Sequence, residues 1–145
     1  MKIKKMIGNK YALIIEKDEM IIKTLEQFAI KEKIGMALFQ MIGAVTNVTL
    51  GYVPKKSNDY VKKTFLEQYE LLSTIGTIIW DEKDTNKPII HCHTTFGDDN
   101  FNVIGGHMLD AKVAIKVEVI IDILSNEKIS QVIDNKSNFH IWKLS

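Results

Sequence analysis

The feature that most constrains the fold is a run of alternating side chains, KVAIKVEVIID, at residues 112–122. Every second residue from 113 to 121 is β-branched, namely Val113, Ile115, Val117, Val119 and Ile121. All charged side chains of the run lie at the other positions. Because side chains two residues apart share one face of an extended strand, this period predicts a strand with one buried face. A helix is the rival interpretation, but the density of β-branched residues disfavours it.

Strand-like segments also precede and follow this run. Apolar or β-branched stretches predict strands at 10–16, 36–53, 60–80, 89–96, 103–109 and 140–144, with a polar loop at 54–60. Residues 36–53 are interpreted as two strands, or as one long strand bent or bulged at Gly43. Residues 60–80 are predicted to hold two strands with a break near 73–76. The pattern at residues 124–139 is compatible with a short helix or with loops alone.

A helix is predicted after the strand at 10–16. Its apolar face comprises Ile21, Leu25, Phe28 and Ala29, at spacings typical of an amphipathic helix. Asp18 is positioned to cap its N-terminus, Glu19 would lie in its first turn, and Gly35 would follow its end.

These elements together predict the fold class. One early amphipathic helix and six to eight strands, mostly joined by short connections, favour an α+β fold in which the helix packs on a mainly antiparallel sheet. The length of 145 residues suits one domain that spans residues 1–145, and the sequence shows no internal repeat or linker that would divide it.

The charged residues limit the polyanions that this chain could read. Its net charge is +1, and all 19 basic residues are lysines. Arginine is the usual reader of guanine edges and narrow minor grooves, whereas lysine contacts phosphates as a point charge. We therefore expect any contact of this chain with DNA to be weak and non-specific.

The single cysteine and the hydropathy pattern indicate the compartment. One cysteine, Cys92, excludes an internal disulfide and fits a reducing cytoplasm. No signal-like segment is visible, and no stretch approaches the roughly 20 apolar residues that cross a bilayer. We expect a cytoplasmic protein with no membrane partner.

The stretch HCHTTFGDDNFNVIGGHM, residues 91–108, contains three of the four histidines. On a strand, His91 and His93 would project to one side and Cys92 to the other. His107 follows across a turn, so a hairpin could bring its imidazole beside theirs. Three converging imidazoles suit zinc, and three protein ligands plus a water form an open and potentially hydrolytic site. Glu118 is a candidate fourth ligand or orienting partner.

A second interpretation of these histidines stays open. Alternating histidines occur on half-exposed strands that bind no metal, and Gly105 and Gly106 could simply permit a bend or a close backbone approach. His107 could hydrogen-bond a carbonyl at a subunit interface. The residues therefore leave open whether the chain is a metal-dependent enzyme, a ligand-binding protein or a binding module.

Four motifs in order resemble one known family. They are FAIKEKIGMALFQMIGAVTNVTLGY, YELLSTIGTI, HCHTTFGDDNFNVIGGHML and KVEVII. The combination of I-G-A with L-G-Y, then H-x-H and then G-G-H resembles the plants-and-prokaryotes-conserved (PPC) domain over roughly residues 10–125.

This resemblance implies an α+β domain that assembles as a homotrimer. Plant members are nuclear DNA-binding proteins that also contact partner proteins, and stand-alone prokaryotic members are known as predicted DNA-binding proteins. The resemblance thus implies a stand-alone prokaryotic binding or regulatory module. The plant partner-binding motif aligns with Glu67, Gln68, Tyr69, Glu70, Leu71 and Leu72.

Overall fold

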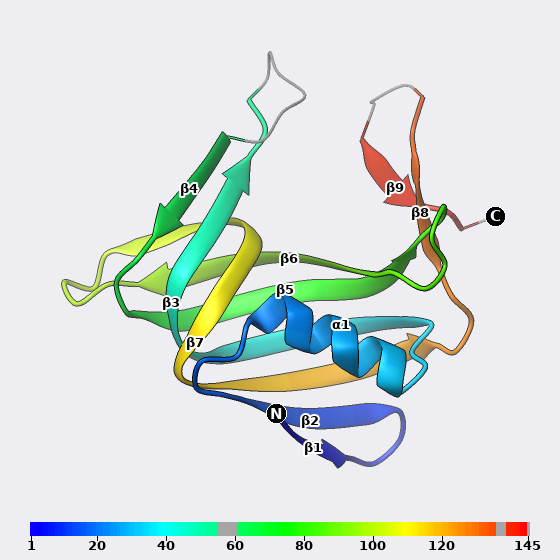
Figure 1. Cartoon of the computed structure of the whole chain (residues 1–145), viewed down its shortest axis with the longest axis horizontal. Helices are drawn as coiled ribbons and strands as arrows, with labels where there is room; N and C mark the ends of the chain where they lie inside the picture. The colour runs from blue at the N-terminus through cyan, green and yellow to red at the C-terminus, as the bar shows by residue number, and fades with distance from the viewer. Residues whose placement is uncertain (55–60, 136–138, 145) are drawn as a thin grey trace.

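The computed structural model describes residues 1–54, 61–135 and 139–144 (Figure 1). The polar loop predicted at 54–60 lies largely outside them. The elements in chain order are β1 (Lys2–Lys5), β2 (Lys10–Glu16), α1 (Ile21–Lys31), β3 (Met36–Tyr52), β4 (Val61–Phe65), β5 (Tyr69–Asp81), β6 (Pro88–Gly97), β7 (Val103–Ser125), β8 (Ser130–Ile133) and β9 (His140–Trp142). A mostly antiparallel sheet with one short helix agrees with the predicted α+β class.

The nine strands of the described residues belong to one sheet. Its main path runs β1-β2-β7-β3-β5-β8-β9, and β4 joins β3, whereas β6 joins both β5 and β7. Between the described strands, β5 and β8 form a parallel pair, and the other pairs are antiparallel. Because β3 pairs with β5, β5 with β6, β6 with β7 and β7 with β3, these four strands form a closed circuit.

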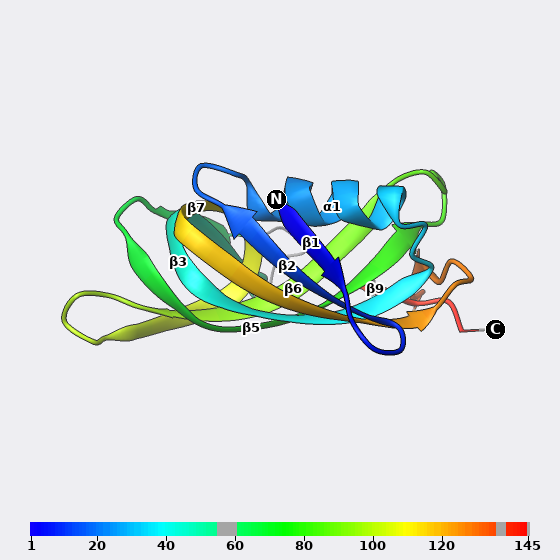
Figure 2. The same ribbon diagram turned by 90° about the horizontal axis from the view of Figure 1, so that it is seen from below.

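The core lies between the curved sheet and α1, which runs along one side of it (Figure 2). Phe28 of α1 is fully buried and packs edge-to-face on Tyr11 of β2, with ring centroids 5.3 Å apart. Phe39 of β3 and Phe96 of β6 are buried in the same cluster. These large apolar side chains hold the strands of the circuit in place, and β6 carries the site described below.

The start of α1 differs from the prediction. The helix begins at Ile21, with no side-chain cap hydrogen bond and no acidic residue in its first turn. Asp18 instead has a positive φ of 70° and forms an ion pair with Lys112 at 2.7 Å. The predicted cap at Asp18 and the predicted first-turn position of Glu19 are therefore wrong.

A carboxylate from a strand distant in sequence accepts a hydrogen bond from the first turn of this helix. Oδ1 of Asp110 in β7 accepts hydrogen bonds from the backbone N–H groups of Ile22, at 3.3 Å, and Ala111, at 2.8 Å. The first N–H groups of a helix have no acceptor within it, so Asp110 satisfies one of them from outside. The two residues are 88 positions apart, so no local sequence signal reveals this contact.

Residues 36–52 form one long strand, β3, so the second of the two predicted alternatives is correct. The strand is irregular around Gly43, which has a φ of 152° and marks shifts in the pairing with β5 and β7. A Cβ atom at this position would lie 2.3 Å from the carbonyl oxygen of Lys116. Close backbone approach therefore requires glycine at the bend.

Other boundaries also differ from the sequence prediction. The break predicted near 73–76 lies inside β5, and the chain leaves β4 at 66–68 instead. Ile115 is 57% exposed although its alternate neighbours in β7 are buried, because the pairing of β7 with β3 shifts between Val113 and Val117. In the described residues, no helix is long and apolar enough to cross a bilayer.

Candidate metal centre

The hairpin of β6 and β7 carries three histidines on one face. His93 in β6 is the direct partner of His107 in β7. His91 lies two positions before His93 and so shares its face, whereas Cys92 points into the core and is 1% exposed. The strand period and the hairpin register together bring the three imidazoles to one place.

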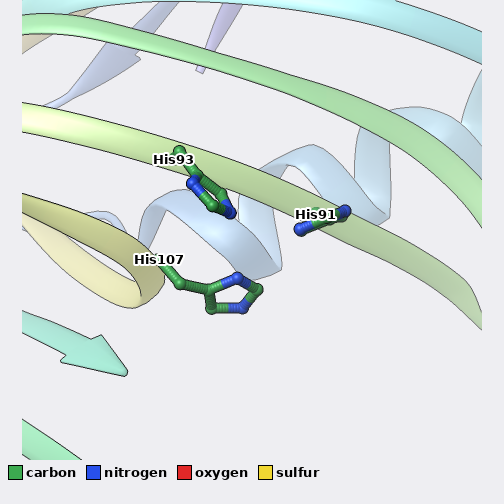
Figure 3. Close-up of side chains that lie close together, drawn as sticks. All are labelled: His91, His93 and His107. Carbon is green, nitrogen blue, oxygen red and sulfur yellow. The ribbon is translucent and has the colours of Figure 1, made fainter. Parts of the chain in front are cut away.

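The three imidazole rings form a nearly equilateral group, the histidine triad (Figure 3). Their centroids are 5.4 Å apart for His91 and His93, 5.1 Å for His91 and His107, and 5.4 Å for His93 and His107. One nitrogen of each ring lies within 4.8 Å of the other two. His91 and His93 are exposed, and His107 is partly buried.

The surroundings favour neutral imidazoles. Burial, with smaller contributions from the like charges of nearby His91 and His93, lowers the pKa of His107 to about 4. Burial also lowers the pKa of His91, with a smaller contribution from His93. Neutral imidazole is the form that coordinates metal ions, so these two side chains are ready to bind at neutral pH.

The donor set fits a transition metal such as zinc. Zinc accepts imidazole nitrogens at about 2.0–2.1 Å, which places the nitrogens of a tetrahedral site about 3.3 Å apart. The nitrogens of the triad lie within 4.8 Å of one another, so modest side-chain rotations would bring them into range. Three protein nitrogens would leave one tetrahedral position open.

The two glycines beside the triad lie within β7 and form no bend. A Cβ atom at Gly105 would lie 2.6 Å from the carbonyl oxygen of Thr94 in β6, closer than van der Waals contact allows. At Gly106 the nearest heavy atom would be Cδ1 of Leu50 at 3.4 Å, an ordinary contact. Of the two roles predicted for the pair, close backbone approach is therefore the one present, and Gly105 supplies it.

The triad opens into a cavity of about 960 Å³. Its walls come from β3 and β4 on one side, β6 and β7 at the base, and the β8–β9 hairpin on the other. Apolar side chains make up much of the lining, including Val61, Phe65, Ile89, Ile104 and Phe139. The polar side chains among the described lining residues include Lys63, Gln131 and the fourth histidine, His140, as well as the triad.

Sequence reasoning missed Lys63 and His140 as members of this site. Lys63 belongs to a lysine pair that resembles ordinary strand surface, and His140 is 33 positions from the nearest histidine of the triad. Both reach the cavity only because β4 pairs with β3 and because β8 pairs with β5 and carries β9. The sequence predicted that His140 lies in a strand, but it did not predict which way the side chain of His140 points.

The structure does not bring Glu118 to the triad. Glu118 lies opposite Ile14 of β2 and Ile42 of β3, and its carboxylate accepts a hydrogen bond from Lys116. It is 11 positions beyond His107, which is roughly 35 Å of extended chain. Among the described residues, the group of potential ligands around His107 contains histidines alone.

The segment aligned with the plant partner motif is divided between core and surface. Tyr69 and Leu71 are buried, and Leu72 is 47% exposed. The hydroxyl of Tyr69 donates to Glu67 at 3.1 Å, and its ring packs on Phe96 with centroids 4.8 Å apart. The exposed members of the segment are Glu67, Gln68, Glu70 and Leu72.

A family model matches most of the chain. The description of the matching family is the Plants and Prokaryotes Conserved (PCC) domain, and the match covers residues 3–125. This agrees with the resemblance found over residues 10–125. No curated protein gives a significant match.

Three solved structures share this architecture. A candidate DNA-binding protein of Bacteroides thetaiotaomicron is 30% identical, with 98% of this chain and 96% of that chain covered and a TM-score of 0.89. A metal-containing protein of Archaeoglobus fulgidus is 29% identical, with 99% of each chain covered and a TM-score of 0.84. A PPC protein of Pyrococcus horikoshii is 26% identical, with 94% and 92% covered and a TM-score of 0.83.

Proposed function

We propose that this chain, which belongs to the Plants and Prokaryotes Conserved domain family, is a metal-binding protein that holds zinc between His91, His93 and His107. One observation carries the proposal: nitrogens of three histidines from two strands lie within 4.8 Å of one another. The relative from Archaeoglobus fulgidus, described as metal-containing, supports the same function.

The donor types favour zinc over harder cations. Imidazole suits zinc, copper, iron and nickel, whereas magnesium and calcium prefer oxygen ligands, and the triad offers none. When bound by three histidines, zinc supplies a Lewis acid with a place for water or a ligand. The protein itself would hold the three imidazoles on one face of the β6–β7 hairpin. The proposal extends to a metal-dependent enzyme, for which no reaction is proposed.

Elemental analysis of tag-free protein tests the proposal. We expect about one zinc per chain in the wild type after dialysis, and a loss of most of it in His93→Ala. The matched control is His140→Ala, which removes a histidine of the same cavity that does not belong to the triad. This control should retain its zinc.

Thermal unfolding supplies a second readout. A ligand that binds only the folded state raises the melting temperature, and the increase grows with the logarithm of the ligand concentration relative to its Kd. Zinc should raise the melting temperature of the wild type and of His140→Ala, and should leave His93→Ala unchanged. Wild-type protein that stays metal-free and insensitive to zinc would refute the function.

DNA binding is the second candidate. It is favoured by the relatives from Bacteroides thetaiotaomicron and Ralstonia eutropha, both described as candidate DNA-binding proteins and 30% and 25% identical to this chain. The net charge of +1 and the absence of arginine argue for weak contact with phosphates that does not depend on sequence. Fluorescence anisotropy with duplex DNA should give binding at low salt that falls steeply as salt rises. No binding at low salt would exclude this role.

Self-association into a homotrimer and a cytoplasmic location complete the proposed function. Ile42, Ile75 and Ile120 point away from the core on neighbouring strands and are 53%, 52% and 54% exposed. Such a row of half-exposed isoleucines is typical of a face that another chain covers. A second copy of the chain is the proposed occupant, and the buried, free thiol of Cys92 is consistent with a reducing compartment. The exposed residues of the 67–72 segment form a further proposed surface for a protein partner.

A further inference from the structure

The cavity above the triad has a lining that indicates which molecules it takes. We propose that it binds a small organic monocarboxylate with an apolar body, and that Lys63 holds the carboxylate. This inference names the ligand class of the site proposed above. The inference depends on the proposed metal site only in that the histidine triad forms the floor of the cavity.

The first argument is the sign of the charges. The described residues that line the cavity include a lysine and four histidines, and they include no aspartate or glutamate. Yet the whole chain carries 18 acidic residues against 19 lysines. A cavity that gathers cationic and neutral side chains and lacks acidic ones favours an anion over a cation.

The second argument is the state of Lys63. Among the described residues, its ammonium group belongs to none of the ion pairs. Its Nζ atom lies 4.8 Å from the centroid of the Phe65 ring, which also lines the cavity. The ring face attracts the ammonium group and holds it at the cavity wall. A carboxylate in the cavity would therefore meet a cation that has no competing acidic partner among the described lining residues.

The third argument is the balance of charge and apolar surface. One lysine supplies a single point charge, which matches a monocarboxylate better than a phosphate with two charges and three acceptor oxygens. Val61, Ile89 and Ile104 offer apolar surface that a strongly hydrated inorganic anion would not use. A cavity of about 960 Å³ has room for an organic body beside the carboxylate.

Four probes that differ in charge or in chain length test this class. Isothermal titration calorimetry with intact protein would compare hexanoate, acetate, hexylammonium and hexanol, each with zinc-loaded and with chelator-treated samples of known metal content. We expect hexanoate to bind at least about tenfold more tightly than acetate, because the longer chain removes more apolar surface from water. Hexylammonium, with the same body and the opposite charge, should not bind, and hexanol should bind more weakly than hexanoate.

Variants locate the carboxylate. Lys63→Gln should weaken hexanoate binding about fivefold or more, because it removes a charge-assisted hydrogen bond. The matched control is Lys62→Gln on the same strand, because Lys62 is not among the lining residues. It should bind like the wild type. Val61→Asp, which adds an acidic group to the exposed wall, should abolish binding, whereas the uncharged Val61→Asn should retain part of it.

The outcomes separate this inference from the metal site. Hexanoate binding that depends on Lys63 supports the inference in either sample. If such binding is found and the wild-type protein takes up no zinc, the metal proposal alone fails. Equal affinity of Lys63→Gln and the wild type would overturn it. Absence of hexanoate binding in both samples, or equal binding of hexylammonium or acetate, would overturn it as well.

Discussion

Gly105 and Gly106 are adjacent in β7 but meet different surroundings, and this difference is measurable. Gly105→Ala would place a methyl group 2.6 Å from the Thr94 carbonyl oxygen, so one of the two strands must move. We expect it to lower the free energy of unfolding by about 1–3 kcal/mol, as overpacking does, and to reduce zinc content because His107 follows two residues later. Gly106→Ala meets only an ordinary contact at 3.4 Å and should cost much less.

Chemical denaturation of both variants checks this prediction, and metal analysis of the same samples checks its consequence for the triad. The Gly106→Ala protein controls for the general effect of alanine in place of glycine in a strand. Equal losses of stability in the two variants would mean that the close approach of Gly105 to β6 is not what requires glycine.

Cys92 lies between two histidines of the triad but faces the core. Burial, with a smaller contribution from the nearby carboxylate of Asp110, raises the pKa of its thiol to about 12. Because the thiolate is the reactive form, we expect iodoacetamide at pH 8 to modify the native protein at least about a hundredfold more slowly than the unfolded chain. Mass spectrometry over time measures both rates. Similar rates would show that the β6–β7 hairpin opens readily.

At the scale of elements, α1 depends on a carboxylate from β7. Burial raises the pKa of Asp110, so the folded protein holds this proton more tightly than the unfolded chain does. Ionisation of Asp110 therefore lowers stability as the pH rises from the ordinary value of 3.8 through the higher pKa of the folded state. The same oxygen still accepts the N–H of Ile22 and benefits the helix.

Two substitutions separate the charge of Asp110 from its hydrogen bond. Asp110→Asn keeps an acceptor without the charge, so at pH 7 it should be more stable than the wild type, and this advantage should shrink as the pH falls toward 3.8. Asp110→Ala removes the acceptor and should cost about 1 kcal/mol, as loss of a helix cap does. Urea unfolding at several pH values distinguishes the two. An Asn variant as unstable as the Ala variant would contradict this account.

The elements also show what the sequence could predict. Period-two patterns indicated most strands, and the H-x-H spacing placed His91 and His93 on one face, because these signals are local. The capping of α1 by Asp110, the arrival of Lys63 and His140 at the cavity and the distance of Glu118 from the triad depend on strand pairing between remote segments. Local patterns contain no information about such pairings, and the predicted cap at Asp18 was wrong for this reason.

At the scale of the whole molecule, the outward isoleucine row predicts self-association. Ile120 of β7 and Ile75 of β5 lie on either side of Gln40 of β3. A charged side chain at one of these isoleucine positions would therefore be buried in any interface that this face forms. We expect the wild type to sediment as a trimer of about 50 kDa, given 16.6 kDa per chain. Ile120→Lys should dissociate it, since an unpaired buried charge is costly.

The matched control for this variant is Ile7→Lys. Ile7 is 95% exposed, lies in the turn between β1 and β2 and does not belong to the row. Light scattering coupled to size exclusion, together with sedimentation velocity, measures the mass of each protein. A monomeric wild type, or a trimer that tolerates Ile120→Lys as well as it tolerates Ile7→Lys, would rule out this face as the interface.

The pairing of His93 with His107 has a consequence for how a gene of this kind can change. Strand side chains alternate, so one additional codon between those for Thr94 and Gly97 would shift the facing of β6 by one position. His91 and His93 would then turn inward and Cys92 outward, although none of the three had been substituted. A point mutation in the turn at 98–102 does not change the number of residues in β6, whereas an in-frame insertion or deletion within the strand would shift the register on which the triad depends. The site is thus protected by the number of residues in β6 as much as by their identity.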